Sequence, residues 1–303
     1  MKTMRAVIVV LFISGLLYAQ EPEATSLLGK PLYAPELSAE ARAEYEKNLE
    51  IAKQDYEKSP QNADAIIWLG RRIGYLGEFN KAIEIFTQGI EKFPGEARFY
   101  RHRGHRYLTI RQIDKAISDL ENAASLIQGR ADQIEPDGIP NEKNIPTSTL
   151  QSNIWYHLGL AYYLKGDFTR AARAYRECMR VSKNDDMYCA TAHWLYMTLR
   201  RLNHREEAAA LLETIRKDMN LIENMDYHQL LLMYKGLVKP ADLMKKAEDD
   251  LANATIGYGI ANWYLYNGDS RKAYQMFEDI TKGKMWPAFG YLAAEAELAR
   301  SKR

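Results

Sequence analysis

A short pattern of small and aromatic residues recurs along most of this chain, and it restricts the fold more than any other feature. One copy, with the spacing W-x2-L-G-x2-Y, begins at Trp155 and is followed by Ala171 and Tyr175. Its small residue recurs, in steps of 34, 55, 37, 33 and 32 residues, as Ala82, Ala116, Ala171, Ala208, Ala241 and Ala273. A repeat of this length indicates consecutive helix pairs that stack on one another.

These residues and spacings resemble the tetratricopeptide repeat, a 34-residue pair of antiparallel helices. The resemblance covers about residues 62–286 and implies an all-α fold, an α-solenoid (right-handed superhelix) of about six helix pairs. Gly70, Gly104 and Gly159 then let the two helices of a pair approach each other, and the repeated alanines do so from the other side. The fifth unit is degenerate, because Lys245 stands where an aromatic residue is expected.

The ends of the array and one insertion complete the expected domain organisation. Residues 38–61 are predicted to form an N-terminal capping helix, which Ser38 caps and Pro60 ends. Residues 287–303 are predicted to form a C-terminal capping helix after Pro287. The step of 55 contains a proline-rich insertion at 131–151, which either is a tolerated surface loop or covers the binding groove.

The N-terminus has the layout of a secretory signal peptide over residues 1–19. A basic start is followed by an apolar run and by Ala19, a small residue suited to cleavage. Residues 20–37, with three prolines, are expected to be an extended linker. No other stretch approaches membrane-spanning length, so we expect an exported protein, periplasmic or extracellular, without stable membrane insertion after cleavage.

Composition and motifs exclude several functions. A net charge of +1 over 303 residues argues against a dedicated nucleic-acid binder. The chain lacks the common hydrolase, phosphate-loop and dinucleotide motifs, so no catalytic residues and no cofactor are predicted. His102 and His105 share a helix face, but no acid or cysteine stands beside them, and they are interpreted as groove residues rather than metal ligands.

The two cysteines, Cys178 and Cys189, leave two alternatives open. In an oxidising compartment they could form a disulfide if their Cα atoms lie within about 7 Å. Otherwise both are buried free thiols that pack as small apolar residues.

In tetratricopeptide arrays the first helices line a concave groove, and the resemblance places a partner-binding site there. The repeat register assigns to this groove Arg71, Arg98, Arg101, His105, Asn153, Tyr156, Tyr163, His193, Tyr258 and Asn262. Residues 97–111 hold five arginines and no acid, so this end of the groove is cationic. The arginines could instead be a solvated face, and the tyrosines could belong to the core.

The predicted function is that of a protein- or peptide-binding scaffold of the cell envelope. Its partner is expected to be an extended protein or peptide segment, acidic where it meets the arginines. The alternative is an enzyme or a carbohydrate-binding protein that uses the same groove for cell-wall or glycan fragments.

Overall fold

The computed structural model describes residues 21–247 and 249–302, and almost all of its regular structure is helical. The predicted signal peptide at 1–19 lies outside the described residues. The first helices of the successive pairs are α2 (Ala63–Tyr75), α4 (Ala97–Thr109), α6 (Leu150–Lys165), α8 (Asp185–Arg201), α10 (Met225–Tyr234) and α13 (Tyr258–Tyr266). The second helices are α3 (Phe79–Lys92), α5 (Ile113–Leu126), α7 (Phe168–Val181), α9 (Arg205–Glu213), α11 (Pro240–Met244) and α14 (Ser270–Ile280). The predicted all-α solenoid is therefore confirmed.

Further elements flank the pairs. Helix α1 (Ala39–Lys58) precedes the first pair, with the Ser38 side chain accepting a hydrogen bond from the backbone of its first turn, and α15 (Phe289–Ser301) follows the last. A short helix α12 (Asp250–Ala252) and a π-helical turn η1 (Asn253–Gly257) lead into α13. Two short antiparallel strands, β1 (Ala24–Thr25) and β2 (Pro31–Leu32), form a hairpin before α1.

The motif residues hold each pair together as their spacing predicts. A Cβ atom added to Gly70 would lie 2.5 Å from the ring of Phe86, and one added to Gly159 would lie 2.6 Å from the ring of Tyr175. Five of the six alanines that open the second helices are buried, among them Ala116 and Ala171, whereas Ala241 of the degenerate fifth unit is exposed. Small residues on the first helix therefore receive aromatic rings from the second, which brings the two backbones close together.

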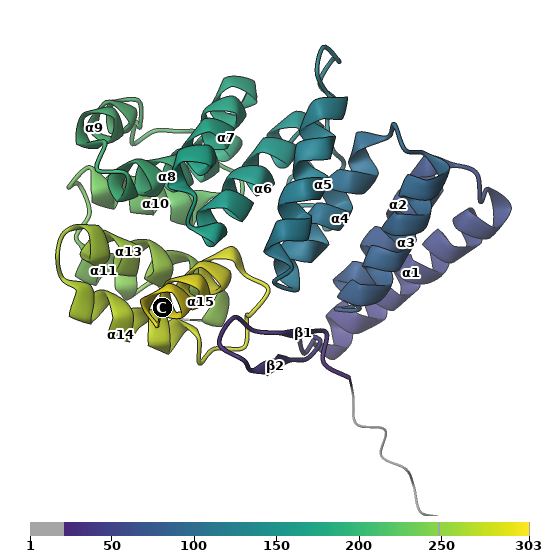
Figure 1. Cartoon of the computed structure of the whole chain (residues 1–303), viewed down its shortest axis with the longest axis horizontal. Helices are drawn as coiled ribbons and strands as arrows, with labels where there is room; N and C mark the ends of the chain where they lie inside the picture. Colours follow the sequence, from purple (N-terminus) through teal and green to yellow (C-terminus); the bar gives the residue numbers. More distant parts are fainter. Residues whose placement is uncertain (1–20, 248, 303) are drawn as a thin grey trace, which may run out of the picture.

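The array curls, so that its last helices return toward its middle. In Figure 1 the pairs follow an arc from α1 to α10, and α13, α14 and α15 lie below α8 and α6. Side chains of α13 contact those of α6 and α8 directly, and α15 packs against α14, η1 and α6. The concave side of the solenoid thus faces elements of the same chain.

Helix α15 is buried on all sides rather than on one face. Every residue from Gly290 to Leu298 is buried, and this includes Glu295 and Glu297, which are each 1% exposed. A helix that is apolar all round belongs in the centre of a domain. Here α15 is a central helix around which the array closes.

The segment expected to be an extended linker contacts the rest of the molecule. The backbone carbonyl of Tyr33 accepts a hydrogen bond from the indole of Trp286 (2.8 Å), and Glu36 pairs with Lys284 (2.9 Å). The β1–β2 hairpin lies between α15 and the first units (Figure 1), where the backbone of Leu27 donates to Glu295. Proline content predicts an extended backbone but neither the β1–β2 pairing nor these contacts.

Candidate functional site: a filled concave face and an open groove

The tyrosines predicted to line an open groove are core residues. Tyr163 and Tyr258 are fully buried, and the Tyr258 hydroxyl donates to the Tyr163 hydroxyl at 2.8 Å. The Asn262 amide, also fully buried, donates to the same oxygen at 2.9 Å. These residues do face the concave side, but α13 meets α6 there, so the prediction that they are accessible is wrong.

The other central positions are covered in the same way. Tyr156 and His105 lie against the ring of Phe289 on α15, with centroid distances of 6.1 and 5.6 Å. His193 is 1% exposed and stacks on Tyr234 of α10. The Asn153 side chain is buried and donates to the Ser148 hydroxyl at 2.8 Å. A partner segment finds no open surface at these residues.

The insertion covers the cationic end of the concave face. Glu135, buried within it, forms an ion pair with Arg101 (2.9 Å), and the carbonyl of Pro136 accepts a hydrogen bond from Arg71 (2.8 Å). Arg98 lies farther out and binds Glu96, its neighbour at the start of α4 (2.9 Å). Glutamates of the chain itself therefore pair with arginines for which the sequence predicts an acidic partner segment.

Burial keeps the histidines of this region uncharged. It lowers the pKa of His157 and of His193 to about 3, and the neighbouring arginines contribute at His157. The pKa values of His102 and His105 are also well below the ordinary value, for the same two reasons. Among residues 21–247 and 249–302, no group of three or more potential metal ligands comes together.

The two cysteines are free thiols, so of the two alternatives the structure has the unbridged one. The Cys178 thiol lies 3.1 Å from the hydroxyl of Thr191, whereas the Cys189 thiol points to the sulfur of Met219 at 3.6 Å. Burial raises the pKa of each thiol to about 12.

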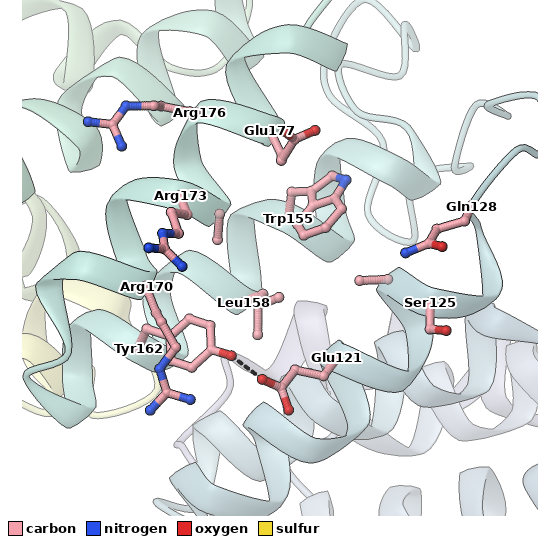
Figure 2. Close-up of a pocket in the computed structure, with 12 residues that line it drawn as sticks. Glu121, Ser125, Gln128, Trp155, Leu158, Tyr162, Arg170, Arg173, Arg176 and Glu177 are labelled. Carbon is pink, nitrogen blue, oxygen red and sulfur yellow. Dashed lines mark hydrogen bonds between the residues drawn. The ribbon is translucent and has the colours of Figure 1, made fainter.

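The open surface lies elsewhere, between the second helices α5 and α7. We call it the α5–α7 groove; its main part has a volume of about 540 Å³. Figure 2 shows Trp155 and Leu158 of α6 at its base, Arg170 and Arg173 of α7 on one side, and Ser125 and Gln128 of α5 on the other. Trp155 is half-buried, and the Tyr162 hydroxyl donates to Glu121 across the lower end. A second hollow shares Trp155 and continues the groove past Arg130 and Arg180.

Comparison with the preceding unit explains why this groove is open. In that unit Arg103 of α4 binds Asp119 of α5 (2.7 and 2.8 Å) and Thr87 of α3 (3.0 Å), which fills the gap between the second helices. Fifty-five residues later, Leu158 and Ala174 stand at the positions of Arg103 and Asp119. An alanine methyl and a leucine cannot bridge the gap, so it remains hollow with an apolar floor.

The rim of the α5–α7 groove has an excess of positive charge. The residues that line its two parts include five arginines, Arg130, Arg170, Arg173, Arg176 and Arg180, against two glutamates, Glu121 and Glu177. Arg176 is paired with Glu207 of α9 at 2.7 Å. Arg173 is exposed and forms no ion pair within the described part of the chain.

Sequence reasoning missed this groove because Trp155 matched a packing position of the motif. A signal was nevertheless present at residue 174. The equivalent positions in the other five units hold Ile85, Asp119, Leu211, Met244 and Met276, and Ala174 has the smallest side chain of the six.

Comparisons with known proteins agree with the repeat pattern. The family model of the tetratricopeptide repeat matches residues 152–185, which span α6 and α7. A search of curated proteins finds no match to the chain. One similar solved structure is YrrB, described as a TPR protein with an unusual peptide-binding site (15% identity, 79% of this chain and 96% of that chain, TM-score 0.45). MamA (16% identity, 67% and 98%, TM-score 0.44) and the Cut9–Hcn1 assembly (16% identity, 79% and 37%, TM-score 0.47) are others.

The matched unit defines the family. Helix pairs precede and follow it, and the two preceding pairs also have glycine on the first helix (Gly70, Gly104) against a second helix that opens with a buried alanine (Ala82, Ala116). The chain therefore contains a tetratricopeptide repeat at residues 152–185, within an array of consecutive helix pairs.

Proposed function

We propose that this protein is a scaffold that binds a segment of a partner protein in the α5–α7 groove and not on its concave face. The observation that supports this proposal most is the contrast between the two surfaces. The concave face is occupied by α13, α15 and the insertion, whereas the α5–α7 groove is open and has the half-exposed Trp155 at its centre.

The chemistry of the groove favours a segment with apolar and acidic side chains. An aromatic residue in a pocket, surrounded by charged side chains, is the usual composition of a binding hot spot. Five arginines against two glutamates make the rim complementary to acidic residues. The segment would place an apolar side chain over Trp155 and Leu158 and a carboxylate beside Arg173.

Export remains part of the proposal, resting on the layout of residues 1–19. In the described residues no helix is both long and apolar enough to span a bilayer. We place the scaffold in the periplasm or outside the cell, and we propose no catalytic role for it.

A screen of displayed peptides against the mature chain tests the proposed groove. We expect the enriched peptides to combine aromatic or aliphatic residues with Asp and Glu and to bind with micromolar Kd values. Trp155→Ala should weaken the binding of such a peptide at least tenfold, because it removes the central aromatic contact. Arg173→Glu should weaken it most at low salt, where charge attraction is least screened.

Trp263→Ala is the matched control, because Trp263 is also half-buried but belongs to the last unit. Its peptide affinity should equal that of the unmodified chain. Enriched peptides whose binding responds to Trp263→Ala and not to Trp155→Ala would place the binding site outside the α5–α7 groove.

A further inference from the structure

A small, mostly enclosed cavity of about 110 Å³ lies beneath the insertion, between α2 and α4. It is separate from the α5–α7 groove. Its wall is formed by two glycines, aromatic residues and a cluster of charged or titratable side chains, namely Arg71, Arg101, His102, His105, Arg106 and Glu135. The volume equals that of about four water molecules.

The charges around this cavity do not balance. Three arginines line it, and Glu135 is the one carboxylate among the lining residues. Glu135 pairs with Arg101, whereas Arg71 binds a carbonyl and the Tyr75 hydroxyl, and Arg106 forms no ion pair within the described residues. Burial lowers the pKa of Arg106 to about 10, so the side chain still carries its charge at neutral pH. Asp137 is half-buried in the insertion; burial and the charge of Glu223 raise the pKa of its carboxyl, although Arg71 acts in the opposite direction.

The histidines add donors but no negative charge. The His102 Nδ1 atom accepts a hydrogen bond from Arg101 (3.0 Å), and the His105 Nδ1 atom accepts one from Arg106 (3.0 Å). Because a guanidinium group only donates, the proton of the neutral His102 ring lies on Nε2, whereas both ring nitrogens of His105 lie within 3.5 Å of Arg106. The His102 ring therefore presents an N–H group as well.

Polar atoms in the cavity wall also lack partners. Arg101 is 8% exposed, and its Nε atom has no hydrogen-bond acceptor; Glu135 is 7% exposed, and its Oε2 atom has no donor. Buried groups of this kind normally bind protein, ordered water or a ligand. An excess of two positive charges beside the unpartnered Nε donor of Arg101 is costly unless an anion is bound.

We propose that this cavity binds a free tetrahedral oxyanion, phosphate or sulfate. A divalent oxyanion cancels the excess charge of the three arginines over Glu135, and its four oxygens accept hydrogen bonds from Arg101, Arg106 and Arg71. The insertion closes over the ion, because Glu135 and the carbonyl of Pro136 fasten it to the same arginines. The bound ion would stabilise the first two units and leave the α5–α7 groove unchanged.

Isothermal titration of the mature chain with sulfate, phosphate and chloride, at constant ionic strength and pH 7.5, tests this site. Sulfate and phosphate should bind at least tenfold more tightly than chloride. Phenyl phosphate should bind at least tenfold more weakly than phosphate, because its ring exceeds the cavity. Equal affinity for phenyl phosphate would contradict a free ion as the ligand, and equal affinity for chloride would overturn the site.

Two variants should change sulfate affinity in opposite directions. Arg106→Gln should weaken binding at least tenfold, because it removes an unpaired guanidinium group. Glu135→Gln should strengthen binding several-fold, because it removes the competing carboxylate, and this variant tests the site even if Arg106→Gln fails to fold. Arg205→Gln, at an exposed arginine of α9, is the control and should have no effect. Unchanged affinity in Glu135→Gln would contradict the proposal.

Discussion

Arg111, in the turn between α4 and α5, donates a hydrogen bond to Glu295 of α15 with an Nη2–Oε2 distance of 2.8 Å, although 184 residues separate them. The backbone of Arg111 is left-handed, with a φ of 67°. Glycine occupies the equivalent turn at Gly77, Gly166 and Gly268. A non-glycine residue there costs about 1–2 kcal/mol. The Arg111–Glu295 ion pair joins the second unit to the central helix α15.

Removing the Arg111 side chain should destabilise the whole fold. Arg111→Met leaves the Glu295 carboxylate buried without its cation, and we expect the free energy of unfolding to fall by about 3–5 kcal/mol. Urea unfolding measures the loss. Arg176→Met is the control, because the Arg176–Glu207 pair is exposed and should contribute less than about 1 kcal/mol. If the free energy of unfolding fell by the same small amount in both variants, Arg111 would not stabilise the packing of α15.

Lowering the pH below about 6.5 should destabilise the protein, even at pH values at which the carboxylates are still ionised. Burial lowers the pKa of His102, His105, His157 and His193 below the ordinary value of about 6.5. Below that pH the unfolded chain binds protons that the folded chain does not. The stabilisation from these neutral rings is therefore complete above pH 6.5 and declines as the pH falls toward 3, by up to about 1.4 kcal/mol per pH unit for each histidine.

Urea unfolding at pH 7.5, 6.5 and 5.5 checks this pH dependence. The free energy of unfolding should fall between the first two values by about a third as much as between the last two. His193→Gln should show a shallower dependence, because it removes one of the titrating rings. A constant free energy down to pH 5.5 would show that these histidines titrate normally in the folded protein.

The thiols should be unreactive until the protein unfolds. Cys178 and Cys189 are free, buried and have pKa values raised to about 12, so little thiolate forms at neutral pH. Alkylation with iodoacetamide should label neither cysteine in the native chain and both in urea without reductant. A disulfide would be revealed if neither cysteine were labelled in urea and the mass of the chain were lower by two hydrogen atoms than that of the dithiol form.

Export predicts a shortened N-terminus. Cleavage after Ala19 would leave Gln20 as the first residue of the mature chain. Mass spectrometry of the protein purified from its native cells should give this mass from the envelope or the medium. Recovery of a chain that begins at Met1 from the cytoplasm would refute export.

Local pattern was sufficient to predict the helix pairs, because their determinants are close in sequence. Gly159 and Tyr175, for example, are sixteen residues apart and meet within one unit. The closure of the array could not be predicted in this way. It depends on contacts between distant units, namely Tyr163 with Tyr258 and Arg111 with Glu295. These contacts depend on how several successive units are rotated relative to one another, which the sequence of a single repeat does not determine.

Local pattern could not predict either whether the candidate site residues are accessible. First-helix residues such as Tyr156 and Arg101 do point to the concave side, but what covers them comes from α15 and the insertion. The α5–α7 groove is open because Leu158 and Ala174 replace the Arg103–Asp119 pair of the preceding unit, and position 174 lies outside the repeat motif. Comparing that position between units would have revealed it.

The affinity of the Ala174→Leu variant for the tightest-binding acidic peptide tests the central claim most directly. Ile85 and Leu211 show that a larger apolar residue fits the equivalent position in other units. Leucine at 174 should therefore fill the floor of the α5–α7 groove beside Trp155 and leave the Tm nearly unchanged. The account predicts at least a tenfold loss of peptide affinity in this variant. Full affinity with the Tm intact would contradict it and show that the partner binds elsewhere on the protein.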